Sequence, residues 1–459
     1  MRRIFALTLV LMAVLPPAAA NALEALTLER AVALALERNL TLQASREDYE
    51  AAKWGLRGAR ASLFPSLGLS STARRVDSET YRRANASLGF AEEFGIEVEP
   101  FLYETTYETG FYLKVPIWNG GKIWGAVGAA SGGRDAAMYA HESTRRAVVV
   151  DARTAYFDVL RAESLLAVQL DAVDAARRNA EAAGRRRDVG LAGRAEFLRW
   201  QVMLANEERG LADAEGAVSL ARTRLLSVLG LPLDEEHSLQ AVPETLLDEA
   251  VERYASAVGD RSFPEARART LLRDNPDFLA LSAATRVTSS GVAIARGAFL
   301  PSLNATGTYG WKADDDIDPD DETAWSVTLA LDLPVFTSFK NLSDYQSSKR
   351  SYLAAARRQE DGERALVSAL RGAGTGVESS LKALDAARLE REHAAELVKN
   401  VRNMYSQGMA SYTELADAEV LFGRGSAAAV NALFECLTAL AEVERLLGTD
   451  TADRTGDDR

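Results

Sequence analysis

The sequence predicts a mainly helical fold with a small β part, built from two similar halves. Three observations predict it. Long stretches rich in Ala, Leu, Arg and Glu contain almost no proline, which indicates rod-like helices. Four segments of roughly nine residues alternate apolar with small or polar side chains, as strands do. Short motifs recur at constant spacing along the chain, which indicates a structural duplication.

The N-terminal residues have the pattern of a secretory signal peptide. Arg2 and Arg3 precede an apolar run from Ile4 to Leu15, and small residues follow at positions 18–20. The run is too short for a transmembrane helix, which needs about 20 residues. We therefore expect residues 1–20 to be removed on export; a buried N-terminal helix is the alternative. No later apolar run suggests a transmembrane helix.

Composition excludes several classes of function. The formal net charge of −13 argues against a nucleic-acid partner, because phosphate binding needs clustered Lys and Arg. Cys436 is the single cysteine, so no intrachain disulfide forms, and we expect a small core residue there. His141, His237 and His393 are scattered, and no nucleophile or phosphate-loop motif appears. We expect no catalytic residue, no metal site and no cofactor.

The two halves align through repeated motifs. RASLFPSL at 60–67 and RGAFLPSL at 296–303 lie 236 residues apart, as do Asn39 and Asn275. VPIW at 115–118 and LPVF at 333–336 lie 218 residues apart, as do Gly190 and Gly408. The 18-residue difference falls between Leu67 and Val115 and marks a variable loop. We expect a first repeat at 21–230, a linker at 231–262, a second repeat at 263–448 and a disordered tail at 449–459.

Each half predicts the same order of elements. A short helix at 27–38 begins after Thr27, a suitable N-cap, and a second helix at 41–63 stops before a proline. The helix expected at 119–187 would be about 100 Å long, and its return helix carries a coiled-coil seam at Leu211, Val218, Leu225 and Leu229. Three glycines at 372, 374 and 376 predict a kink or bulge in the second long helix. Strands are expected at 66–75, 105–115, 302–312 and 324–333, and the other long helices at 195–229, 337–406 and 411–447.

The four strands fit either a membrane barrel or a soluble sheet, and the signal peptide and the repeat favour the barrel. Each strand is long enough to cross a bilayer when tilted, and a half-buried soluble sheet would show the same alternation. Four strands cannot close a barrel, which needs at least about eight, so strands of several subunits must share one. Aromatic residues near strand ends suggest a membrane girdle: Tyr107, Tyr309, Trp311 and Trp325. Prolines mark the four strand-to-helix junctions: Pro65, Pro116, Pro301 and Pro334.

Nearly the whole mature chain resembles the TolC family of outer-membrane efflux proteins. The resemblance rests on the duplicated halves, on VPIWNGGK after the second strand, and on the opening LTLERAVALALERNLTLQASREDYEAAKWGLRGARASLFPSL. It implies a homotrimer in outer-membrane lipid, with a 12-stranded barrel continued by an α-helical barrel across the periplasm. It also implies a passive exit duct for a tripartite efflux pump or a type I secretion system, which works with a periplasmic adaptor protein and an inner-membrane RND, ABC or MFS transporter.

The resemblance also places the functional residues at the helical hairpin tips. The tips expected to contact the adaptor are Val189, Gly190, Leu191 and Ala192 in the first half, and Gln407, Gly408, Met409 and Ala410 in the second. Acidic residues matching the family's periplasmic constriction are Glu414 and Asp417, one helical turn apart. Glu196 is the first-half equivalent of Glu414, and Arg194 with the basic run 185–187 is expected to pair across subunits.

Two alternatives accompany this interpretation. The acidic stretch 313–323 lacks the ligand frame of a calcium loop, so a solvated loop is the better reading. The rival function is a periplasmic coiled-coil adaptor or structural protein, in which the strands would form a small soluble sheet. The sequence does not identify the cargo.

Overall fold

The structure, a computed structural model, describes residues 25–87, 101, 103–190, 193–235, 237–243, 245–258, 264–313 and 323–448. The expected signal peptide, the expected tail and most of the acidic stretch 313–323 lie outside these residues. The chain divides into two compact units. We call the unit with 40–148, 254–379 and the residues from 442 the sheet unit, and the unit with 149–253, 380–441 and the residues up to 39 the hairpin unit.

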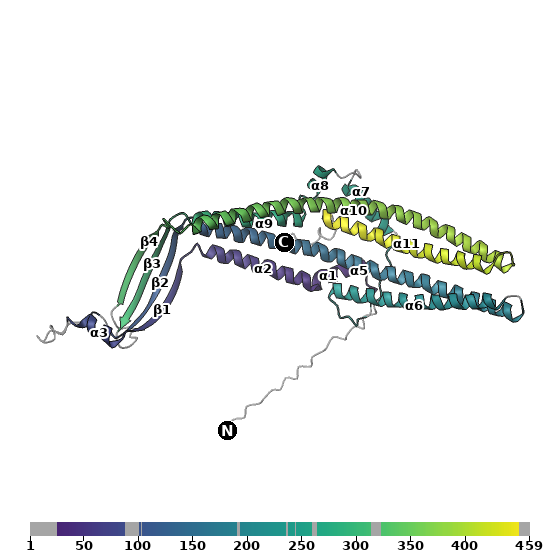
Figure 1. The fold of residues 1–459 in the computed structure, drawn as a ribbon, viewed down its shortest axis with the longest axis horizontal. Coiled ribbons are helices and arrows are strands. Elements are labelled where there is room, and N and C mark those ends of the chain that lie inside the picture. The colour runs from purple at the N-terminus through teal and green to yellow at the C-terminus, as the bar shows by residue number, and fades with distance from the viewer. Residues whose placement is uncertain are drawn as a thin grey trace, which may run out of the picture. The chain divides into compact units, whose positions relative to one another are not determined.

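Both halves contain helices, then two strands, then two long helices, and the short helix α3 lies between the strands of the first half only (Figure 1). The first half contains α1 (Leu28–Arg38), α2 (Leu40–Ala61), β1 (Ser66–Arg75), α3 (Ser78–Asn85), β2 (Thr105–Asn119), α5 (Lys122–Asp188) and α6 (Arg194–Leu229). Then come α7 (Thr245–Val258), α8 (Glu265–Leu271), α9 (Pro276–Gly297), β3 (Ser302–Ala313), β4 (Thr323–Asp332), α10 (Lys340–Ser406) and α11 (Tyr412–Leu447).

Three pairs of corresponding helices in the two halves have the same length. The helices α2 and α9 have 22 residues each, α5 and α10 have 67 each, and α6 and α11 have 36 each. At 1.5 Å per residue, α5 and α10 are each about 100 Å long. Each starts three residues later than the sequence suggested. Thr27 caps α1 as expected, its hydroxyl accepting a hydrogen bond from the Arg30 N–H at 3.1 Å.

The strands form one antiparallel sheet in the order β1-β2-β3-β4 (Figure 1). Its register puts apolar side chains on one face, because residues directly opposite each other share a face. Leu69 lies opposite Phe111, which lies opposite Tyr309, which lies opposite Trp325. Leu67, Leu113, Val327, Leu329 and Leu331 extend this apolar face, and all are exposed. On the other face lie Ser, Thr and Gly with Glu108 and Lys114.

The polar face is crowded at its centre and depends on glycine. Gly110 and Gly310 lie opposite each other, and a Cβ on Gly110 would stand 2.8 Å from the Gly310 Cα. A Cβ on Gly68 would stand 2.4 Å from the ring of Tyr112. Small residues on this face and large ones on the other allow the sheet to curve toward the polar side.

Pro116 does not lie at a strand-to-helix junction, where the sequence had predicted it. Pro65 and Pro301 directly precede β1 and β3, and Pro334 lies between β4 and α10, but Pro116 lies inside β2. The pairing of β1 with β2 ends at Lys114, so beyond it β2 pairs with β3 alone. The register shifts between Pro116 and Trp118. A proline without an N–H is tolerated at such an irregular, one-sided position.

The glycines of α10 correct a second expectation. The helix runs through Gly372, Gly374 and Gly376 as regular α-helix, so the expected bulge is wrong. Leu370 and Val377, on either side, are fully buried and hold this stretch by tertiary packing.

Two helices pass a length and composition test for membrane spans, although the sequence reading found none. They are α9 and α11, each with a mean hydropathy of 1.3. Half of the α11 window is buried inside the chain, as in a packed bundle. In α9 only 6% of the window is buried inside the chain, although Val287, Ser290 and Ile294 lie against glycines of α5. Cys436 of α11 is buried, as predicted.

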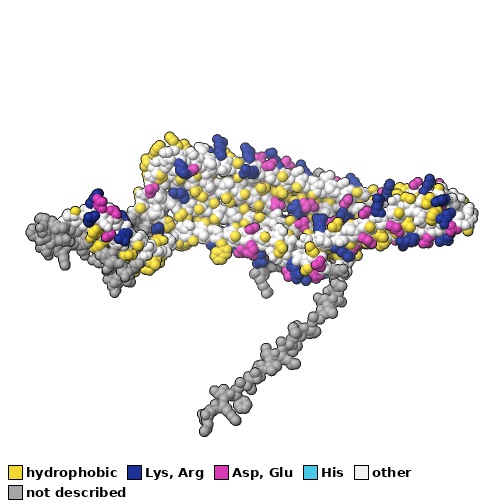
Figure 2. Space-filling view, turned by 60° about the horizontal axis from the view of Figure 1, so that its bottom comes forward, with side chains coloured by type: hydrophobic (Ala, Val, Ile, Leu, Met, Phe, Trp, Pro, Cys, Tyr) yellow, Lys and Arg dark blue, Asp and Glu magenta, His cyan; other side chains and the backbone are white. Residues whose placement is uncertain are grey.

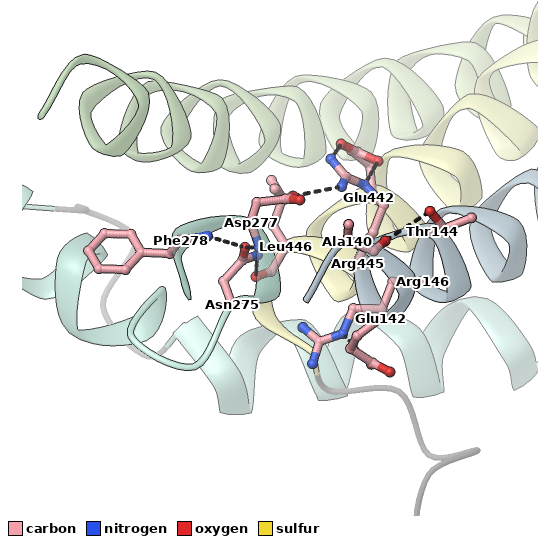
Figure 3. A network of polar contacts seen from close by, with 10 residues as sticks. All are labelled: Ala140, Glu142, Thr144, Arg146, Asn275, Asp277, Phe278, Glu442, Arg445 and Leu446. Carbon is pink, nitrogen blue, oxygen red and sulfur yellow. Dashed lines mark hydrogen bonds and ion pairs between the residues drawn. The ribbon is translucent and has the colours of Figure 1, made fainter. Parts of the chain in front are cut away.

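Equivalent asparagines join helix ends in both halves. The Asn39 side-chain amide donates to the Val228 carbonyl at 2.9 Å, and the Asn275 amide donates to the Leu446 carbonyl at 2.9 Å. Figure 3 shows Asn275, whose Oδ1 also accepts from the Asp277 and Phe278 N–H groups and caps α9. Each asparagine thus ties the start of one helix to the end of another within its unit.

A buried tyrosine holds the first described residues of the hairpin unit. Leu26 forms a parallel bridge with Leu239, in which the Leu26 N–H donates to Ser238 and the Gln240 N–H donates to Leu26. The Tyr156 hydroxyl lies 2.8 Å from the Leu26 carbonyl oxygen and 2.6 Å from that of Gln240. Burial raises the pKa of Tyr156 to about 12.

We predict that Tyr156→Phe destabilises the protein by about 1–3 kcal/mol, because two buried carbonyls lose their shared donor. The wild-type hydroxyl stabilises the fold below pH 10, the usual tyrosine pKa, and this contribution disappears as the pH rises toward about 12. Urea unfolding of both proteins at pH 8 and pH 11 measures the difference, with Tyr352→Phe as the control. An equal midpoint for wild type and Tyr156→Phe at pH 8 contradicts the prediction.

Candidate gate at the hairpin tips

Each pair of long helices is closed by a glycine turn. Gly190 follows α5 with φ +75°, and Gly408 follows α10 with φ +74°, as the tight turns require. Val189 and Met409 beside them are 70% and 62% exposed. Gln407 and Ala410 complete the second turn, whereas Leu191 and Ala192 of the first lie outside the described residues. The tips therefore present apolar side chains to solvent.

Behind the tips an apolar cluster joins the two hairpins. Trp200 of α6, 1% exposed, is its largest member, and Ala180, Ala183 and Leu415 pack with it. The Tyr412 ring of α11 meets the Trp200 ring edge-on at a centroid distance of 6.5 Å. Partly buried residues from α6, α10 and α11 surround them: Phe197, Met203, Leu204, Val401, Tyr405 and Ala416. Burial of an indole here holds the hairpins together by the hydrophobic effect.

A hydrogen bond between hairpins lies beside this cluster. The Tyr405 hydroxyl of α10 donates to the Glu196 carboxylate of α6 at 2.7 Å. Burial and this bond to the carboxylate raise the pKa of Tyr405, so the hydroxyl stays protonated and remains a donor. The Arg186 guanidinium lies 5.1 Å from the centre of the Tyr405 ring. Glu196, expected at a gate, is thus engaged within its own chain.

A buried carboxylate makes a second tie between the hairpins. Glu419 of α11, with a side chain 8% exposed, accepts from the Asn179 amide of α5 at 2.9 Å. Its other oxygen accepts from Arg402 of α10 at 3.1 Å. Both carboxylate oxygens are therefore used, which is the condition for keeping such a charge buried.

The two acidic residues of the expected constriction differ in their surroundings. Glu414 accepts from the Ser411 N–H at 2.6 Å, and the Glu414 N–H donates to the Ser411 hydroxyl at 3.3 Å. This reciprocal pair is a capping box at the start of α11. The backbone and hydroxyl hydrogen bonds from Ser411 lower the pKa of Glu414. Asp417 is exposed one turn further along the helix.

The basic residues near the first tip contact their own chain. Arg187 forms an ion pair with Asp188 at 2.6 Å and stacks on the Phe197 ring at 4.3 Å, and Arg185 lies 3.9 Å from Glu181. Arg194 is exposed at the start of α6. On the face drawn in Figure 2, basic, acidic and apolar side chains are interspersed.

Sequence reasoning missed the residues that join the hairpins: Trp200, Tyr405, Asn179 and Glu419. A signal for two of them was available in the repeat. At the 218-residue spacing, Tyr405 corresponds to Arg187, and Trp200 corresponds to Ala418. Large changes of side chain between matched positions mark the places where the two hairpins have different roles.

Comparisons with known proteins agree with this geometry. The family described as outer membrane efflux protein matches residues 31–231 and 268–449. The outer membrane protein OprJ of Pseudomonas aeruginosa is 24% identical over 430 residues, which cover 92% of this chain and 84% of OprJ. The outer membrane protein TolC of Escherichia coli is 22% identical and covers 90% of this chain and 80% of TolC. The CmeC outer membrane channel of Campylobacter jejuni superposes with a TM-score of 0.78 at 18% identity, covering 92% of this chain and 85% of CmeC.

We predict that Glu414→Ala accelerates amide hydrogen exchange several-fold at residues 411–415, because the first turn of α11 loses its cap. In the wild type this protection holds above pH 4.5 and is lost as the pH falls through the lowered pKa of Glu414. Mass spectrometry of peptides covering the second tip measures the exchange. Asp417→Ala is the control, and equal exchange in the two variants contradicts the capping role.

Proposed function

The chain belongs to the outer membrane efflux protein family, and on that premise we propose that three copies form a passive exit duct closed at the hairpin tips and opened by an adaptor. It lies in the outer membrane with its helices in the periplasm, as the family's channels do. The observation that carries the proposal is the set of contacts joining the hairpins behind their tips: the Trp200 cluster, Tyr405 with Glu196, and Glu419 with Asn179.

The sheet supplies the membrane part of the proposed duct. Its apolar face would contact lipid and its polar face would line water, because side chains alternate along every strand. Tyr107, Trp311 and Trp325 are each the third residue from the loop end of their strands. Tyr309 lies on β3, two residues further from that end than Trp311. We assign these four aromatics to a girdle at the outer boundary of the bilayer. In this role three copies would contribute twelve strands.

The hairpin contacts give each copy a closed tip of its own. A cluster around a buried indole and two hydrogen bonds to carboxylates would keep the two hairpins together until another protein intervenes. The exposed tips around Val189, Gly190, Gly408 and Met409 are the proposed docking site of a periplasmic adaptor. An inner-membrane RND, ABC or MFS transporter would supply the cargo and the energy.

The acidic residues are proposed to act on ions at the tip. Three copies of Asp417 around a threefold axis would concentrate negative charge. This charge would attract cations, and the three carboxylates would repel one another. Glu414 would add to this field while it caps α11, and Arg194 would lie nearby as a counter-charge. Family members are channel proteins rather than enzymes, and a duct of this kind needs neither a cofactor nor a metal.

We predict that Tyr405→Phe increases the open probability of the channel about fivefold, because loss of one hydrogen bond corresponds to roughly 1 kcal/mol. Single-channel recording in planar bilayers measures it. Tyr412→Phe is the matched control, because phenylalanine keeps the ring contact with Trp200. Open probability that rises equally in both variants, or in neither, removes the assigned role of the Tyr405 hydroxyl.

We predict that Asp417→Asn weakens block by divalent cations at the periplasmic end about tenfold, since three negative charges disappear from one ring. The concentration of Mg²⁺ that halves the conductance measures the change. Asp213→Asn, an exposed change in the middle of α6, serves as the control. Unchanged block in Asp417→Asn rules out an acidic constriction at this position.

A further inference from the structure

We infer that Lys114 and Asp332 set the charge selectivity of the sheet. They form a balanced pair of opposite charges on its polar face, where Lys114 attracts anions and Asp332 attracts cations. The inference rests on the proposed duct and adds the residues that decide which charges its membrane part admits. Such a pair favours cargo with both a cationic and an anionic group, because each group meets an opposite charge on the wall.

Strand pairing fixes the side of the sheet on which both residues lie. Lys114 of β2 lies opposite Ser66 of β1 and Thr306 of β3, and Asp332 of β4 lies opposite Ser302 of β3. All these partners belong to the polar face, because side chains alternate along a strand. Lys114 and Asp332 are both exposed. In the proposed duct both charged groups would therefore face the water-filled lumen.

An aromatic ring supports the ammonium group of Lys114. Its Nζ lies 4.8 Å from the centre of the Tyr112 ring, on the same face of the same strand. Gly68 lies opposite Tyr112, and a Cβ built on it would stand 2.4 Å from that ring. Glycine therefore leaves the space that the ring occupies. The ring face attracts the cation and keeps it beside the wall of the sheet.

Neither charge is cancelled by a partner. Within the part of the chain that the structure describes, Lys114 and Asp332 form no ion pair with each other or with another residue. Their strands lie on either side of β3 (Figure 1), which separates them by about 10 Å. The other acidic residue on this face of the described strands is Glu108, six residues or about 20 Å from Lys114 along β2. Each charge thus acts on ions in its own surroundings.

The duplication relates the two positions. The corresponding residues, at the repeat spacings of 236 and 218, are Ser66 and Ser302, Gly68 and Asn304, Tyr112 and Ala330, and Lys114 and Asp332. The pairing follows the same rule, since Lys114 lies opposite Ser66 and Asp332 lies opposite Ser302. The second half builds this strand pair with no aromatic support and with the opposite charge. The fold therefore requires neither side chain.

The equivalence places both charges at one level of the proposed duct. When strand pairs with the same register close around an axis, equivalent residues lie at equal depth. Three copies would then carry positive and negative groups alternately around the lumen. Removal of either residue would leave three charges of one sign at that level, which changes the local concentration of mobile ions.

Reversal potentials of single channels in a KCl gradient test the pair. Lys114→Gln is expected to lower the ratio of chloride to potassium permeability by about twofold or more, and Asp332→Asn to raise it by a similar factor. The double variant is expected to return to the wild-type ratio. Single variants that shift the ratio in the same direction, or leave it unchanged, overturn the inference.

A matched control removes a positive charge from the other face of the sheet. Arg75 lies opposite Thr105 on the apolar face, and its side chain is 76% exposed. Arg75→Gln is expected to leave the permeability ratio unchanged, and an effect as large as that of Lys114→Gln overturns the inference. The effects of the lumen variants should be present at about 0.1 M KCl and vanish near 1 M, where charges act over only about 3 Å. A shift that persists at high salt indicates distortion of the channel and also overturns it.

Chemical modification changes the charge at one position in one folded channel. In a Cys436→Ala background, Lys114→Cys is treated with a methanethiosulfonate reagent that carries either a trimethylammonium or a sulfonate group. The cationic reagent is expected to restore the wild-type ratio and the anionic one to lower the ratio further. Equal effects of the two reagents, or no reaction with either, overturn the charge-selecting role of position 114. A wild-type protein that gives no conductance contradicts the proposed duct itself.

Discussion

The free edges of the sheet are the constraint on which the rest of the structure depends. Backbone N–H and C=O groups at an edge have no partner in lipid, and four strands are too few to close on themselves. The sheet also has an exposed apolar face, which includes Leu329 and Trp325 and needs an apolar environment. In the proposed duct, strands of further copies pair with these edges. The long helices follow from this, since rods of about 100 Å have little core of their own and must pack side by side.

The duplication gives both halves the same long helices and turns, and the proposed gate lies where the two halves differ in sequence. Matched features are the glycine turns at 190 and 408 and the amide hydrogen bonds of Asn39 and Asn275. These features occur at matching positions, and the long helices that they bound have equal lengths in both halves. At the tips, however, Tyr405 stands where the first half has Arg187, and Ser411 stands where it has Gly193. The hydrogen bond from Tyr405 to Glu196 depends on this difference in sequence, because two identical hairpins would carry the same side chain at positions 187 and 405.

Much of the fold could be predicted from the sequence, and the wrong or missing predictions share one cause. Helix periodicity, glycine turns and strand alternation are local signals, so bounds such as 66–75 for β1 agreed with the structure. Pro116 and the glycines of α10 were misjudged because neighbours decide their cost: a one-sided strand tolerates the proline, and buried Leu370 and Val377 hold the helix. The contacts of Glu419 with Asn179 join residues 240 positions apart, which no local pattern reveals. Glu414 lies in the first turn of α11, and the sequence did not predict its capping partner Ser411.

The contact between the two halves of the sheet unit bears on movement. Inside the chain, Gly125 and Gly132 let α5 and α9 approach so closely that any side chain there would collide. Contacts this tight resist sliding, because small displacements forfeit much of the dispersion energy. Opening of the proposed duct would therefore leave α5 and α9 packed against each other in each copy.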